Sequence, residues 1–181
     1  MIVVLMGVSG SGKTVVGEAL ATRLNWAFED ADHWHSAANI QKMRRGVALT
    51  DADREPWLRS LNGAVRKWIA DKLDVVLACS ALRESYRKML REGVDDPESI
   101  RFVYLRGTYE EIDKRLGLRA GHFMPESLLA SQFAALEEPD SSEAFVADAS
   151  HPVAHVVDSI VSGLQLSAAR GPKLESRRKH P

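Results

Sequence analysis

The chain has 181 residues but a single cysteine, Cys79, which excludes a disulfide bond within the chain and a four-cysteine zinc site. Its formal net charge is only −1, so nothing in the overall charge points to nucleic acid or to an anionic membrane. It has no apolar run near the ~18 residues that a membrane-spanning helix needs, and no basic stretch ahead of its first apolar residues. We therefore expect a cytoplasmic protein that binds neither nucleic acid nor membrane.

The composition is that of an ordinary globular domain, with 45% apolar and 27% charged residues. The length suits one domain, which we expect to span residues 1–166. Residues 167–181 have almost nothing apolar to bury, and they carry five cations from Arg170 onward against one acid, Glu175. We interpret them as a disordered basic tail.

Short apolar runs typical of buried strands alternate with helix-like segments along the domain. The predicted strands are residues 2–6, 26–29, 74–79, 101–105 and 144–147. The predicted helices are residues 13–24, 53–73 (with Pro56 in the first turn), 81–92, 109–116, 125–136 and 153–166. This alternation predicts a three-layer α/β fold, with a parallel sheet of about five strands covered by helices on both faces. Ligands of such sheets bind beyond the carboxyl ends of the strands, where the motifs below fall.

Residues 7–14 read Gly-Val-Ser-Gly-Ser-Gly-Lys-Thr and lie between a predicted strand and a predicted helix. This pattern is a P-loop, in which backbone N–H groups and the start of the helix surround phosphate oxygens. Lys13 supplies a charge for the β and γ phosphates, and the Thr14 hydroxyl is a Mg²⁺ ligand. The sequence therefore predicts a site for ATP and Mg²⁺, formed by Gly7, Ser9, Gly10, Ser11, Gly12, Lys13 and Thr14.

Two carboxylates, Asp30 and Asp32, follow the second predicted strand. In an extended segment they point to the same side, so one can serve the Mg²⁺ site while the other orients an acceptor hydroxyl. The alternative is a helix cap or turn, which aspartate also favours. A metal site that includes His33 and His35 is less favoured, because Mg²⁺ prefers oxygen ligands.

A polar stretch follows, in which Lys42 and Arg45 would share one face of a helix. Such cations hold a substrate carboxylate, and arginine does so with two hydrogen bonds. The alternative is an ordinary solvated helix face. Near residues 115–121, Arg115 and Arg119 are combined with two glycines, which is typical of a lid that closes over phosphates. The alternative there is a helix end with glycine caps.

The combination of motifs resembles the gluconokinase family over about residues 2–166. The residues that carry the resemblance are the P-loop, Asp-Ala-Asp-His-Trp-His at 30–35, Asn-Ile-Gln-Lys-Met at 39–43, Gly46, Leu-Thr-Asp-Ala-Asp-Arg-Glu-Pro-Trp-Leu at 49–58, Cys-Ser-Ala-Leu-Arg at 79–83, Tyr-Arg at 86–87, His-Phe-Met-Pro at 122–125, and Leu-Leu, Ser-Gln-Phe and Leu-Glu at 128–129, 131–133 and 136–137. The chain departs from the usual family pattern at Ala31, Trp34, Ser36 and Arg83, and Trp34 is expected to narrow the acceptor pocket.

The resemblance implies transfer of the ATP γ-phosphoryl group to the 6-hydroxyl of D-gluconate. It also implies Mg²⁺, a nucleoside-monophosphate-kinase-like fold with a lid around residues 115–125, and a cytosolic homodimer. It assigns Lys13, Asp32 and Arg119 to catalysis, Arg115 to the nucleotide, and Thr14 and Asp30 to the metal. The substrate contacts that it implies are Asp32, His35, Lys42, Arg45, Arg54 and Arg83.

Other functions stay open at this point. A shikimate-kinase-like enzyme or a nucleoside monophosphate kinase would use the same fold, although Cys79-Ser80-Ala81 stands where we expect a glycine-rich turn for shikimate. A nucleotide-dependent switch without an acceptor is the non-kinase alternative. A GTPase is not indicated, because the guanine-selecting Asn-Lys-x-Asp pattern does not occur.

Overall fold

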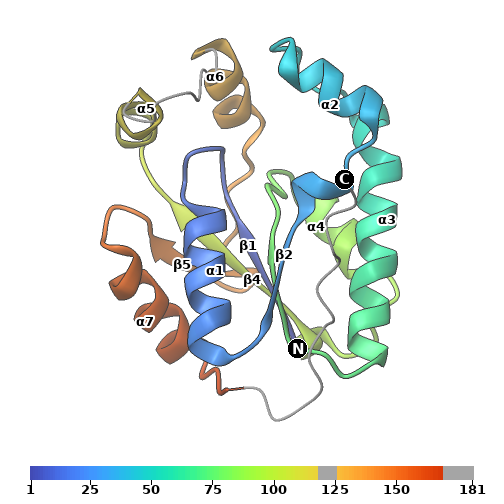
Figure 1. The fold of residues 1–181 in the computed structure, drawn as a ribbon, viewed down its shortest axis with the longest axis vertical. Coiled ribbons are helices and arrows are strands. Elements are labelled where there is room, and N and C mark those ends of the chain that lie inside the picture. Colours follow the sequence, from blue (N-terminus) through green and yellow to red (C-terminus); the bar gives the residue numbers. More distant parts are fainter. Residues whose placement is uncertain (118–125, 169–181) are drawn as a thin grey trace.

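The computed structural model describes residues 1–117 and 126–168, and in them one parallel sheet has the strand order β2-β3-β1-β4-β5 (Figure 1). The strands are β1 (Ile2–Met6), β2 (Ala27–Asp30), β3 (Val75–Ala78), β4 (Ile100–Arg106) and β5 (Ala144–Asp148). β1 pairs with both β3 and β4, so it is the central strand and delivers the P-loop to the middle of the carboxyl-terminal edge. The predicted fold class is confirmed.

Helices connect the strands and extend beyond them. The α-helices are α1 (Lys13–Leu24), α2 (Ala37–Arg44), α3 (Asp51–Ala70), α4 (Glu84–Arg91), α5 (Tyr109–Gly117), α6 (Glu126–Ala135) and α7 (Val153–Gly163). Two 3-10 turns are η1 (Ala31–Trp34) and η2 (Pro97–Ser99). In the part of the chain that the structure describes, no helix is long and apolar enough to cross a membrane.

Two helix starts differ from the prediction, each for a local reason. α3 begins at Asp51 rather than residue 53, because Thr50 and Asp53 form a reciprocal capping box, and Pro56 consequently lies in the second turn. α4 begins at Glu84 rather than residue 81, because Ala81 has a φ of 41° and cannot belong to a right-handed helix. The segment between β3 and α4 is therefore a loop at the edge where ligands bind.

The core has one apolar layer on each face of the sheet. α1 and α7 cover one face, where Val3 and Leu5 of β1 pack with Leu20 and Ile160. α3 and α4 cover the other face, where Val4 packs among a cluster that includes Leu61 and Leu90 (Figure 1). Every residue of β1 is 0% exposed, as expected for a central parallel strand buried on both faces.

A third and smaller apolar cluster holds α5 and α6 against the P-loop. It joins Val8 of the loop with Leu82, Ile112, Leu116 and Leu129. Beyond the carboxyl ends of the strands, α5 and α6 project on one side and α2 on the other (Figure 1). This arrangement places the predicted lid helices and the helix that carries Lys42 around one edge of the sheet.

Candidate active site

The P-loop has the backbone conformation that its glycines predict. Gly12 precedes α1 with a φ of 97°, in the left-handed region. Gly10 has a φ of 84°, and a Cβ there would lie 2.9 Å from Leu116 Cγ and 3.0 Å from Ile112 Cγ2. The Lys13 ammonium group donates to the carbonyls of Gly7 and Val8, at 3.0 and 2.9 Å. The lysine is thus held at the loop that would receive the phosphates.

The side chains of Thr14 and Asp30, the two residues expected at a magnesium site, are in hydrogen-bond contact. The Thr14 hydroxyl donates to Asp30 Oδ2 at 3.0 Å, across the space between α1 and the end of β2. Both groups offer oxygen atoms, the ligand type that Mg²⁺ prefers. Asp30 Oδ1 also accepts the Asp32 N–H at 3.0 Å and caps η1, so the helix-cap alternative is correct for this residue as well.

The prediction that Asp30 and Asp32 lie in one extended segment is wrong, because β2 ends at Asp30 and Asp32 lies in the 3-10 turn η1. The two side chains are not successive same-side positions of a strand. Asp32 is 77% exposed, and its Oδ1 lies 4.0 Å from His35 Nε2. Asp32 still lies at the carboxyl-terminal edge of the sheet, and its charge acts on Cys79 together with those of Asp30 and Lys13.

The loop after β3 adjoins the P-loop. The Gly7 N–H donates to the Ser80 carbonyl at 3.2 Å, which joins the two loops directly. Cys79 is 1% exposed, and burial raises the pKa of its thiol to about 12. The cysteine is therefore a packed core residue and not a nucleophile. The contact between the loops also brings the segment that leads to Arg83 beside the nucleotide site.

Lys42, which was paired with Arg45 as a candidate for the substrate, also pairs with an acid of the next helix. Lys42 Nζ lies 2.6 Å from Asp53 Oδ1, and Arg45 is the exposed C-cap residue that follows α2. The Asn39 amide donates to the Asp53 carbonyl at 2.8 Å, which further ties α2 to the start of α3. The hydrogen bonds from Lys42 and then Thr50 lower the pKa of Asp53 to about 2. The Lys42 ammonium group thus links α2 to α3 through its ion pair with Asp53.

His35 and Trp34 face the core rather than solvent. The His35 ring stacks on Trp57 with the centroids 4.2 Å apart, and burial lowers the pKa of the imidazole. His35 Nδ1 is buried and has no hydrogen-bond partner among the described residues. Trp34 packs edge to face on Trp68 with the centroids 6.2 Å apart, and it joins the core cluster under α3. The expected narrowing of the acceptor pocket by Trp34 therefore finds no support in its contacts.

Arg54 and Arg83 lie together with two residues to which the sequence assigned no role. Arg83 Nη1 donates to Asp51 Oδ2 at 2.7 Å, and the Tyr86 hydroxyl donates to Asp51 Oδ1. Arg54 Nη1 donates to the Leu49 carbonyl at 2.6 Å and lies 3.8 Å from Asp51 Oδ1. Asp51 and Tyr86 are 35 residues apart, so no local pattern links them.

The lid side is described only in part, because Arg119 lies outside the described residues. Arg115 is at the end of α5, where it donates to the Ala149 carbonyl in the loop after β5. On α6, Gln132 Oε1 accepts the Ser9 N–H of the P-loop at 2.6 Å. Sequence reasoning quoted Gln132 only as part of a motif, and no local signal links it to the loop 123 residues away.

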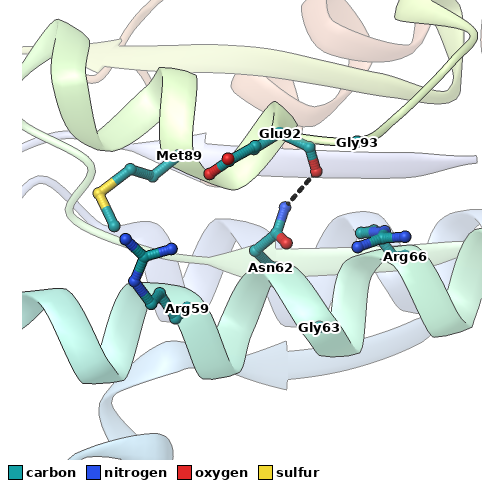
Figure 2. Close-up of a pocket in the computed structure, with 7 residues that line it drawn as sticks. All are labelled: Arg59, Asn62, Gly63, Arg66, Met89, Glu92 and Gly93. Atoms are coloured by element: carbon teal, nitrogen blue, oxygen red, sulfur yellow. Dashed lines mark hydrogen bonds between the residues drawn. The ribbon is translucent and has the colours of Figure 1, made fainter.

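A hollow of about 450 Å³ between α3 and α4 contains none of these residues. Figure 2 shows Asn62 reaching from α3 to the Glu92 carbonyl at 2.8 Å, with Arg59 and Arg66 on either side. The Asn62 amide also donates to the Leu90 carbonyl at 3.2 Å. Asn62 therefore satisfies carbonyls at the end of α4, and we interpret this hollow as a structural contact between the two helices.

Taken together, the residues at the carboxyl-terminal edge form a glycine-rich loop with its lysine, a hydroxyl paired with a carboxylate, an exposed carboxylate, and a cluster of Arg54 and Arg83 with Tyr86. Such a set can position a nucleoside triphosphate opposite a hydroxyl acceptor that carries negative charge.

Comparisons with known proteins agree with this chemistry. A family model described as shikimate kinase matches residues 9–162. A probable gluconokinase of Xenopus tropicalis is 44% identical over 173 residues, which cover 88% of this chain and 91% of the relative. A gluconokinase of Gluconobacter oxydans (strain 621H) is 50% identical over 140 residues, which cover 77% of each chain. The crystal structure of a gluconokinase from Sinorhizobium meliloti 1021 is similar with a TM-score of 0.81 and 41% identity, over 90% of both chains.

Proposed function

We propose, because this chain belongs to the gluconokinase family, that it transfers the γ-phosphoryl group of ATP to the 6-hydroxyl of D-gluconate and releases 6-phospho-D-gluconate and ADP. The enzyme is a phosphotransferase with an alcohol group as acceptor. The observation that carries the proposal is the contact between the Thr14 hydroxyl and Asp30 beside a P-loop lysine, at the same sheet edge as the arginine cluster.

In the proposed mechanism, Lys13 turns from the Gly7 and Val8 carbonyls to the β and γ phosphates and neutralises their charge. Thr14 and Asp30 would hold Mg²⁺, which would supply positive charge to neutralise the phosphate oxygens. Asp32, exposed at the start of η1, orients the 6-hydroxyl or accepts its proton during in-line transfer.

The remaining residues position the two substrates. Arg115 is assigned to the nucleotide and Arg119 to the transferring phosphoryl group, where an arginine is worth ~10³–10⁵ in turnover in related chemistry. Closure of the lid would exclude water and favour transfer to the sugar over hydrolysis. The acceptor's hydroxyls and carboxylate are assigned to His35, Lys42, Arg45, Arg54 and Arg83.

The first test is ADP release from Mg-ATP with D-gluconate, other aldonic acids, shikimate and nucleoside monophosphates as acceptors. We expect strong stimulation by gluconate. Stimulation by shikimate or a nucleotide alone would replace the substrate, and ATP hydrolysis unaffected by any acceptor would favour a switch protein instead.

Two variants test the assigned roles. Lys13→Ala should abolish turnover almost completely, and a rate close to wild type would refute the assignment of the phosphate cradle. Asp32→Asn should lower kcat far more than it weakens nucleotide binding. Equal losses in both would show that Asp32 acts on the metal rather than on the acceptor.

The shikimate-kinase alternative is less favoured, because the relatives at 44–50% identity are gluconokinases and Cys79-Ser80-Ala81 is no glycine-rich turn. We also propose a cytosolic homodimer, as the resemblance implies. Light scattering on the purified protein checks the dimer, and a monomer mass would refute it.

A further inference from the structure

The carboxylate of Asp51 lies in the arginine cluster, which is formed by Arg54 and Arg83 with Tyr86. Asp51 is the first residue of α3, and its two oxygens accept hydrogen bonds from Arg83 and from the Tyr86 hydroxyl, which belong to the loop before α4 and to α4. Arg54 Nη1 stands 3.8 Å away on the following turn of α3. Two hydrogen-bond donors and a nearby guanidinium, from two parts of the chain, thus surround one anionic group.

These groups suit an anion, and each of them also makes a contact besides the one with Asp51. The Arg54 and Arg83 guanidinium carbons lie 5.7 and 5.8 Å from the centre of the Tyr86 ring, within the range of a cation–π contact. Arg54 is also fixed by the Leu49 carbonyl. The hydrogen bond from Tyr86 and then the charge of Arg83 lower the pKa of Asp51, so this carboxyl is ionised near neutral pH.

The Asp51 side chain is 61% exposed and that of Arg83 is 39% exposed, so their ion pair lies at the surface, where a carboxylate from solvent meets it. The cluster also adjoins the rest of the site. The charges of both Arg54 and Asp32 act on His35, and the Ser80 carbonyl, three residues before Arg83, binds the P-loop. In an aldonic acid the carboxylate and the reacting hydroxyl are at opposite ends of the molecule, which agrees with a carboxylate site whose residues are different from those of the P-loop.

We propose that Asp51 is an internal substitute for the carboxylate of the acceptor, and that the acceptor displaces it from Arg83 and Tyr86 on binding. The inference rests on the proposed function, since it assumes an acid as acceptor. It makes Tyr86 a substrate-binding residue and Asp51 a competitor that raises the KM for carboxylate acceptors. In the alternative arrangement, Asp51 keeps its hydrogen bond to Arg83 when the substrate binds and holds the Arg83 side chain in position.

Asp51→Asn and Asp51→Ala separate the two arrangements. The assay is steady-state phosphorylation at saturating Mg-ATP, with D-gluconate and with D-gluconamide, in which a neutral amide replaces the carboxylate. If Asp51 competes, both variants lower the KM for gluconate roughly two- to fivefold, the range expected for an exposed ion pair. The KM for gluconamide stays within error of the wild-type value.

Glu55→Gln is the matched control, because it removes one negative charge from the same end of α3. Glu55 is 54% exposed, similar to Asp51, and pairs with Arg59 outside the cluster. Its KM for gluconate should not change, and a decrease equal to that of the Asp51 variants would show mere charge repulsion and overturn the inference.

The remaining outcomes are also decisive. If the Asp51 variants have wild-type unfolding temperatures and a higher or unchanged KM for gluconate, Asp51 does not compete with the substrate. That result would show instead that Asp51 stays in place and positions Arg83. If the wild-type enzyme phosphorylates neither acceptor, the proposed function itself fails, and this inference fails with it.

Discussion

Replacing Arg87 should destabilise the protein more than any change of a surface charge. Arg87 is 1% exposed, and two of its nitrogens bind the Glu143 carboxylate at 2.6 and 2.9 Å. Its third nitrogen donates to the carbonyls of Ala81, Leu82 and Glu137, at 3.3, 3.3 and 3.0 Å. One side chain therefore joins α4, the loop after β3 and the segment before β5.

In Arg87→Met the volume is nearly retained, but Glu143, whose side chain is only 20% exposed, loses the counter-charge that is hydrogen-bonded to it, and the carbonyls lose a donor. Breaking a buried ion pair from one side costs ~3–5 kcal/mol. With a urea dependence of about 2 kcal/mol per M, the unfolding midpoint should fall by about 2 M. Glu143→Met should have a cost of the same order. The double variant should cost less than the sum, because no buried charge is then left unpaired.

Urea unfolding followed by circular dichroism measures these values. Arg59→Met is the control, since it breaks an ion pair with Glu55 whose side chains are 62% and 54% exposed, and such pairs contribute about 0.5 kcal/mol or less. If Arg87→Met shifts the midpoint no more than Arg59→Met does, or if the effects of the Arg87 and Glu143 variants simply add, the reasoning from burial is refuted.

Four further predictions concern single residues. The pKa of Asp53 is lowered from 3.8 to about 2, so its contribution to stability is complete above about pH 4 and is lost as the pH falls toward 2. Unfolding temperatures of Asp53→Asn should accordingly depend less on pH between 2 and 5 than those of the wild type, and equal slopes would contradict this. Gly10→Ala should destabilise the fold by about 1–3 kcal/mol and raise the KM for ATP, because it puts a Cβ 2.9 Å from Leu116 at a positive φ. Gly63→Ala in α3, where a Cβ meets nothing within 4 Å, should instead stabilise by about 0.5–1 kcal/mol. Cys79, whose thiol pKa is raised to about 12, should react with a disulfide reagent at pH 8 only after unfolding, and rapid reaction of the folded protein would be the contrary result.

The P-loop illustrates what could be predicted without a structure. Its glycines, Lys13 and Thr14 lie within eight consecutive residues, and the strand before them and the helix after them follow from local apolar patterns. The alternation of strands and helices likewise predicted the parallel sheet. Local errors remained where a cap or a backbone angle decided an element's start, as at Thr50 and Ala81.

The sequence by itself determined the fold class, the phosphate cradle and the family, because these depend on residues that are neighbours in the chain. Tertiary structure decided which charges are already engaged: Lys42 with Asp53, Arg83 with Asp51, and Arg87 with Glu143, pairs that are 11, 32 and 56 residues apart. No local sequence pattern specifies these pairs, because each one forms only when the packing of the helices on the sheet brings two distant side chains within hydrogen-bonding distance. The same packing put Asp51 between two arginines that the sequence assigned to the substrate alone.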